Sequence, residues 1–223
     1  NPTGMIYSRS EMEAIARVVE KHEGVFIMSD EVYEHILFEG EHVSMASFDF
    51  IYDRVITVNA VSKAYAMTGW RIGYTGAPKW IVSACDKLQG QFTSGVSSIA
   101  QRAALAALTG KDDSRQMMRN AFLRRRDLIC NLLKDIEGLK VRIPQGAFYV
   151  FPDISFYLGK SDGEKTISTS DDLAIWLLEK AQVAVVGGDA FGAPNCIRIS
   201  YATSDELLIE AVKRIKEALG KLK

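Results

Sequence analysis

The chain has 223 residues, of which 48% are hydrophobic and 25% charged, and its formal net charge is −1. This balance is typical of a globular protein with a sizeable core, and it excludes disordered, collagen-like and coiled-coil classes. The near-neutral charge argues against a nucleic-acid partner, and no apolar run approaches the roughly 20 residues that span a bilayer, so we expect no membrane partner.

The first elements of the chain alternate between helix and strand. Ser8 or Ser10, each with a glutamate three residues later, offers a capping box for a helix over about residues 10–22. Unbroken apolar runs at residues 25–28 and 55–58 predict parallel strands buried on both faces, and residues 71–74 predict a third strand.

Helices dominate the chain from about residue 99, and short strands appear again after Gly138. Apolar spacing predicts a series of helices, over about residues 99–108, 113–136, 171–180 and 204–219. Short strands are expected at residues 141–143, 148–151, 183–186 and 197–201. We therefore predict an α/β domain over residues 1–120 and a smaller α+β domain over residues 121–223, with the boundary inside the long helix.

The cysteines and the first residues give expectations about location and completeness. Cys85, Cys130 and Cys196 are far apart, odd in number and without a CxxC spacing, which favours a reducing compartment and hence a cytoplasmic location. The chain opens with turn pairs over residues 1–4 and without an initiator Met, so we expect a chain cut from a longer one.

Polar side chains that could carry chemistry lie at or near strand ends, where α/β sheets form their sites: Asp30, Ser62, Lys63 and Arg71. A lysine held partly desolvated beside a second cation becomes an amine nucleophile. Arg71 could be that cation and also hold a phosphate in its fork, while Asp30 could keep a heterocyclic nitrogen protonated. Each residue alone has an ordinary structural explanation, but together they describe pyridoxal phosphate chemistry.

Residues 59–74, with Ser62-Lys63 and Arg71 eight residues later, resemble the cofactor-lysine signature of class I aminotransferases of fold type I. Further likenesses follow in the expected order along the whole chain, at residues 1–4, 29–33, 144–149 and 197–201. Residues 91–95 and 186–192 look closest to bacterial aspartate aminotransferases of the subgroup that includes prephenate aminotransferases.

The resemblance implies a role for each matching residue around the cofactor ring. Lys63 would carry pyridoxal 5'-phosphate as an internal aldimine and then act as the general acid and base. Asp30 would keep the ring nitrogen protonated. Tyr33 and Asn1 would hydrogen-bond the 3′ oxygen of the ring.

The same resemblance implies how phosphate and substrate are held. Ser62 and Arg71 would bind the cofactor phosphate, and Arg198 would bind the substrate α-carboxylate through two parallel hydrogen bonds. The chain would be the C-terminal part of the large domain, with its mainly parallel sheet, followed by the small α+β domain. The first half of the large domain, which supplies further cofactor and substrate contacts, would lie outside this sequence.

The predicted function is transamination between an amino acid, aspartate first, and a 2-oxo acid such as 2-oxoglutarate, with prephenate as a further candidate and a homodimer in the full-length form. Two alternatives stay open: a domain fragment without activity of its own, and β-elimination on the same scaffold. A metal site is not expected, because His35 and His42, although they lie among glutamates, have a seven-residue spacing that fits no compact metal motif.

Overall fold

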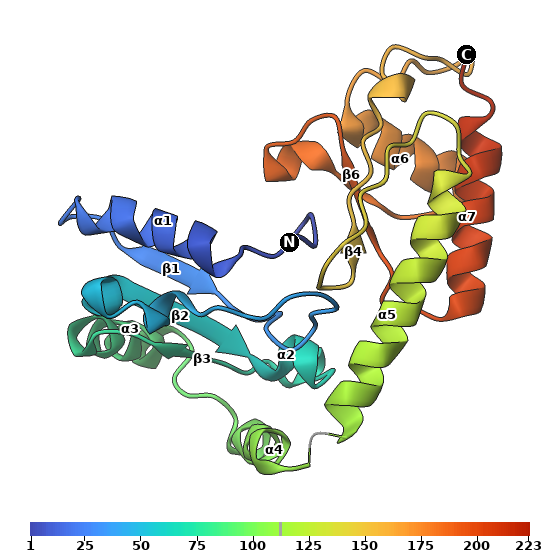
Figure 1. Ribbon diagram of the computed structural model, residues 1–223. Helices are drawn as coiled ribbons and strands as arrows, with labels where there is room; N and C mark the ends of the chain where they lie inside the picture. Colours follow the sequence, from blue (N-terminus) through green and yellow to red (C-terminus); the bar gives the residue numbers. More distant parts are fainter. Residues whose placement is uncertain (112) are drawn as a thin grey trace. The chain divides into compact units, whose positions relative to one another are not determined.

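The computed structural model describes residues 1–111 and 113–223 and divides them into two units, coloured along the chain in Figure 1. The N-terminal unit is Ile6–Arg119, and the C-terminal unit combines Asn1–Met5 with Asn120–Lys223. The division falls inside helix α5 (Asp113–Lys134). That the units are the large-domain part and the small domain of the expected fold stays a prediction.

The first five residues lie with the C-terminal unit, whereas the sequence analysis placed them in the first domain. The reason is a pair of backbone hydrogen bonds, because the carbonyl oxygen of Gly4 accepts from the amides of Gln145 at 2.8 Å and Gly146 at 2.9 Å. Gly4 itself has a φ of +69°, and a Cβ there would lie 2.5 Å from the Cβ of Pro144. Only glycine fits this close approach without strain.

A three-stranded sheet organises the N-terminal unit, in the order β1 (Ile27–Asp30), β2 (Val55–Ala60) and β3 (Gly73–Gly76). Strands β1 and β2 are parallel, as expected, and Asp30 is paired with Val58. Strand β3 lies two residues later than predicted and runs antiparallel to β2. The antiparallel direction follows from the short connection between β2 and β3, since parallel strands need a longer crossover.

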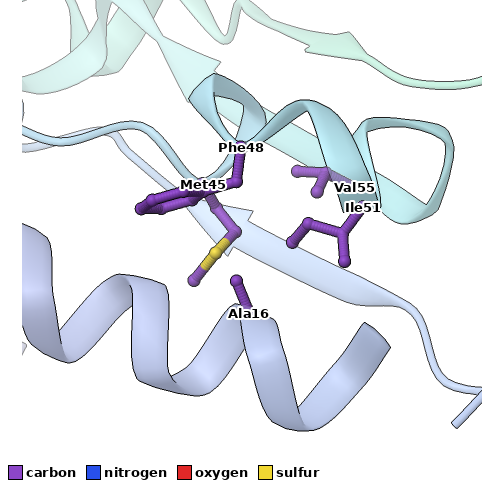
Figure 2. Packing of buried hydrophobic residues seen from close by; sticks show 5 residues of the cluster. All are labelled: Ala16, Met45, Phe48, Ile51 and Val55. Atoms are coloured by element: carbon purple, nitrogen blue, oxygen red, sulfur yellow. The ribbon is translucent and has the colours of Figure 1, made fainter. Parts of the chain in front are cut away.

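Helix α1 (Arg9–Glu20) is held to this sheet by a small apolar core. The capping box is the one formed by Ser8 and Glu11, so the helix begins at Arg9. Figure 2 shows the core from close by, with Ala16 of α1 facing side chains from the 3-10 turns η1 (Met45–Ser47) and η2 (Asp49–Arg54) and from the start of β2. Its buried members are Ala16, Met45, Phe48, Ile51 and Val55.

The far side of the same unit is more exposed than the apolar runs predicted. Met28 in β1 is 74% exposed, and all four residues of β3 are exposed. Helix α3 (Lys79–Phe92), which the sequence analysis did not name, buries none of its residues. Helix α4 (Ser98–Thr109) packs its Ala104 with Val61 of the short helix α2 (Val61–Ala64). The expectation of burial on both faces is therefore wrong for β1, whereas every residue of β2 is buried or half-buried.

The C-terminal unit contains an antiparallel sheet in the order β4 (Tyr149–Val150), β6 (Ile197–Ser200) and β5 (Val186–Gly187). Helices α6 (Ser170–Ala181) and α7 (Asp205–Leu219) contact each other and complete the core. The unit also contains the 3-10 turns η4 (Ser155–Tyr157) and η5 (Gly188–Phe191). Its core includes fully buried large side chains, among them Ile167, Leu173, Trp176, Leu177, Ile197, Tyr201 and Ile215.

The strand expected at residues 141–143 is not formed. Lys140 makes only an isolated antiparallel bridge with Asp153. The backbone that follows is bonded elsewhere, because the carbonyl of Pro144 accepts from the Arg126 guanidinium at 3.1 Å. Within the described residues, we also find no helix with both the length and the apolar character needed to cross a membrane.

Candidate active site

Asp30 is the last residue of β1, on the exposed face of that strand. Its Oδ1 accepts a hydrogen bond from the amide of Val32 at 3.2 Å, which closes a turn directly after the strand. The amide of Glu31 still donates to the carbonyl of Val58 at 2.9 Å, so the ladder with β2 continues one residue past the strand. Asp30 is thus presented at the edge of the sheet where β1 and β2 both end.

Ser62 and Lys63 lie in α2, the single helical turn that follows β2 without a linker. Val61, at the start of this turn, is fully buried against Met67 and Ala104. The hydroxyl of Thr68 donates to the carbonyl of Ser62 at 3.1 Å and so fastens the end of the turn. Lys63 is half-buried and lies at the same sheet edge as Asp30.

Arg71 adopts a left-handed conformation, with φ of 53° and ψ of 52°, which residues other than glycine rarely adopt. Its guanidinium donates to the carbonyl of Thr68 at 3.0 Å. Arg71 and Ser62 line the same pocket of about 560 Å³, together with Asn59, Gly73 and Tyr74. A hydroxyl and a guanidinium facing one pocket are donors suited to a phosphate group.

The segment that carries Tyr33 is tied to β2 by one short side-chain hydrogen bond. The Nδ2 of Asn59 donates to Oε1 of Glu34 at 2.5 Å. Asn59 is buried near the end of β2, four residues before Lys63, so this bond links the two segments that the sequence analysis singled out separately. Burial, together with the nearby Glu34 and Tyr65, raises the pKa of Tyr74 in the same region.

A second link was not predicted from the sequence. Nη1 of Arg115 in α5 lies 2.7 Å from Nε2 of His35, and a guanidinium can only donate in such a hydrogen bond. The guanidinium of Arg115 also lies 5.8 Å from the ring centre of Tyr65, two residues after Lys63. No local sequence motif predicts this contact, because Arg115 and His35 are 80 residues apart.

Arg198 lies in the middle of β6 in the C-terminal unit, where its Nη1 donates to Oδ1 of Asn1 at 2.8 Å. The guanidinium carbon lies 4.5 Å from the ring centre of Tyr149 and 4.9 Å from that of Phe191. Two aromatic rings and an amide oxygen thus hold a planar cation in one orientation, which suits it to a carboxylate. The sequence analysis quoted Tyr149 and Phe191 only as parts of motifs and did not assign them this contact.

The predicted site residues are thus distributed over both units. Asp30, Tyr33, Ser62, Lys63 and Arg71 belong to the N-terminal unit, where Ser62 and Arg71 share a pocket. Asn1 and Arg198 belong to the C-terminal unit and are hydrogen-bonded to each other. Within each unit the arrangement offers anion-binding donors, and the N-terminal unit adds an amine and a carboxylate at one sheet edge.

Comparison with known families gives a match over nearly the whole chain. The profile of the family described as aminotransferase class I and II matches residues 1–215. A bifunctional aspartate aminotransferase and glutamate/aspartate-prephenate aminotransferase from Petunia hybrida is 49% identical over 100% of this chain and 48% of its own length. An aspartate/prephenate aminotransferase from Cereibacter sphaeroides is 47% identical over 97% of this chain and 55% of its own length.

Solved structures give the same picture. The crystal structure of the aspartate aminotransferase from Rhizobium meliloti superimposes with a TM-score of 0.94 at 45% identity. The match covers 100% of this chain and 56% of the Rhizobium meliloti chain. An aromatic aminotransferase from Pyrococcus horikoshii superimposes with a TM-score of 0.88 at 40% identity, over 99% of this chain and 57% of that one. The chain therefore spans about half the length of the relatives it matches.

Proposed function

Since the chain belongs to the class I and II aminotransferase family, we propose that it forms part of a subunit that transfers an amino group from aspartate to 2-oxoglutarate with pyridoxal 5'-phosphate as cofactor. The expected α/β fold of type I transferases is confirmed by the likeness to solved aminotransferases. The proposal rests mainly on one arrangement, the pocket shared by Ser62 and Arg71 next to Lys63.

The residues of the N-terminal unit fit this cofactor. The pocket offers two donors for the cofactor phosphate, Ser62 and Arg71, whereas Lys63 and Asp30 are not among its lining residues. Asp30 lies at the end of the neighbouring strand and offers a carboxylate to a protonated ring nitrogen. When bound, pyridoxal phosphate supplies a ring that accepts the electrons released when the substrate Cα–H bond breaks.

In this proposal Lys63 moves a proton. Its amine, half-buried in the turn after β2, would take the proton from the substrate Cα and would return one to the adjoining cofactor carbon. Asp30 holds a proton at the ring nitrogen throughout, and Tyr33 donates a hydrogen bond to the ring oxygen. These groups are positioned by β1, β2 and α2, so little reorganisation is needed when the proton moves.

Arg198 binds the α-carboxylate of the amino acid. Its guanidinium is held by Asn1, Tyr149 and Phe191, so its two parallel donors are oriented before the substrate arrives. Aspartate is chosen as donor because relatives from Petunia hybrida and Pinus pinaster are named aspartate aminotransferases. Prephenate is a second acceptor candidate, because the Cereibacter sphaeroides relative is named an aspartate/prephenate aminotransferase. A cytoplasmic location and a homodimer remain predictions.

The test is product analysis with aspartate and 2-oxoglutarate on the full-length subunit that contains this chain. The proposal predicts oxaloacetate and glutamate in equal amounts, and a slower or comparable reaction when prephenate replaces 2-oxoglutarate. Release of ammonia without formation of glutamate would indicate elimination instead. The matched control is Lys63→Ala, which retains the fold elements but lacks the amine and should form neither product.

A further inference from the structure

Glu31, which directly follows Asp30, is a buried carboxylate that the proposed reaction does not use. It is only 7% exposed. It accepts hydrogen bonds from the hydroxyls of Ser29 at 3.0 Å and Ser44 at 2.9 Å, and from the amide of Met45 at 3.2 Å. Its other oxygen is 2.8 Å from Nε2 of His42. Both carboxylate oxygens are therefore bonded inside the protein.

His42 donates in this pair, because an ionised carboxylate can only accept. Burial by itself raises the pKa of Glu31, but the hydrogen bonds from His42, Ser44 and Ser29 outweigh it, so the pKa of this carboxyl is lowered. The hydrogen bond to Glu31 raises the pKa of His42 more than burial lowers it. His42, which the sequence analysis considered only as a metal ligand, is thus a hydrogen-bond partner of Glu31.

The geometry connects this pair to Asp30 through one peptide unit. Side chains alternate along a strand, so Glu31 points to the side of the sheet opposite to Asp30. Glu31 is fixed on its side by Ser29 and by the loop that carries His42, and its amide is fixed to Val58. The backbone next to Asp30 is therefore fixed by contacts on the side of the sheet opposite to the Asp30 side chain. The loop that carries His42 continues into Met45 of the apolar core in Figure 2.

We propose that Glu31 and His42 are positioning residues for Asp30: their hydrogen bond fixes the residue that follows Asp30, and the backbone so fixed keeps the Asp30 carboxylate in the orientation that retains pyridoxal phosphate. This inference rests on the proposed function, since it takes Asp30 to be a residue that binds the cofactor. The inference adds that cofactor affinity depends on pH through His42, a residue that does not touch the cofactor.

The sign of the dependence follows from the two groups. His42 has a folded pKa above its ordinary 6.5, so its contribution is fully present below pH 6.5 and is lost as pH rises through the folded value. Glu31 has a folded pKa below its ordinary 4.5, so its contribution is present above pH 4.5 and is lost as pH falls through the folded value. The carboxylates that act on His42 are Glu31 and, more weakly, Glu34. The pair is therefore strongest between these two limits.

The first measurement is the affinity of the full-length subunit for pyridoxal phosphate as a function of pH, for the wild type and for His42→Gln. Glutamine keeps a donor for Glu31 but carries no charge. We expect His42→Gln to weaken binding of pyridoxal phosphate about fivefold near pH 6, as a charge-assisted hydrogen bond becomes neutral, and to have little effect near pH 9. The exposed His22 provides the matched control, and His22→Gln should leave the ratio near one at every pH.

The second measurement separates positioning from general stability. In an Asp30→Asn background, His42→Gln should no longer change cofactor affinity, although it should still lower the unfolding midpoint below pH 6.5. The positioning role alone would be overturned by either of two results. One is that His42→Gln changes cofactor affinity equally in the Asp30→Asn background and in the wild type, and the other is that its effect on affinity does not vary with pH. Absence of cofactor binding by the wild type would instead overturn the proposed function, and the role of the pair with it.

Discussion

Arg198 illustrates how much of a binding residue's function is decided by its neighbours. A guanidinium on an exposed strand has many orientations, and ordering it for a ligand costs conformational entropy. Here Asn1 accepts from one nitrogen while Tyr149 and Phe191 lie on the cation, so most of that ordering is already present. A lysine at the same position would lack both the planar stacking and the second parallel donor.

We therefore predict that Arg198→Lys weakens the affinity of the full-length subunit for aspartate about 10- to 100-fold, the loss expected when a hydrogen bond to a charged group is removed. Cofactor affinity should change little, because the phosphate donors Ser62 and Arg71 lie in the other unit. Substrate and cofactor titrations followed by absorbance measure both constants. Arg214→Lys, which changes a surface pair with Glu210, is the control, and loss of cofactor affinity with unchanged aspartate affinity would contradict the role of Arg198.

At the scale of single elements, the sequence was most informative where local chemistry decides the outcome. The Ser8 and Glu11 side chains satisfy free amides at the start of α1 in both directions, which is a local and recognisable arrangement. The apolar runs at residues 25–28 and 55–58 also predicted β1 and β2, although β1 lies two residues later than its run.

The elements that were missed depend on distant partners. The strand expected at residues 141–143 is absent, and the carbonyl of the next residue, Pro144, is bonded to the distant Arg126. The Glu31–His42 pair depends on a loop that returns 11 residues later, and the Arg115–His35 contact spans 80 residues. A single sequence contains no periodic signal for such contacts, whereas the motif around Lys63 is contiguous.

The capping box gives a direct test at this scale. Ser8→Ala should lower the free energy of unfolding by about 1 kcal/mol, because the amide of Glu11 loses its side-chain acceptor and Glu11 loses a donor. Ser10→Ala, two residues later and inside the helix, should change it by less than about 0.5 kcal/mol. Urea unfolding followed by circular dichroism measures both. Equal effects of the two substitutions would show that Ser8 does not cap α1.

For the molecule as a whole, the important fact is that the chain spans about half the length of its relatives. Large apolar side chains are exposed along α3, where Trp80, Leu88 and Phe92 are 63%, 60% and 84% exposed. Apolar side chains that gather on one helix favour association with other surfaces. The alternative of a fragment without activity of its own therefore stays open for the isolated 223 residues.

We predict that the isolated chain self-associates and transaminates at least about 100-fold more slowly than a full-length relative, because small misplacements at such a site cost about this factor. Sedimentation velocity over a range of concentrations and the aspartate assay measure the two properties. Phe92→Ser should reduce the association, while Tyr52→Ser, at an exposed position on η2, should not. A monomeric chain with the turnover of a full-length relative would contradict both expectations.

The covalent position of the cofactor tests the central claim most directly. The full-length subunit is incubated with pyridoxal phosphate, reduced with borohydride, digested and analysed by mass spectrometry. Lys63 lies in the helical turn after β2, at the sheet edge where Asp30 also lies, and next to Ser62, which lines a pocket with Arg71. The account therefore predicts that the label is found on Lys63. A label on any other lysine, or no label after reduction, would contradict it.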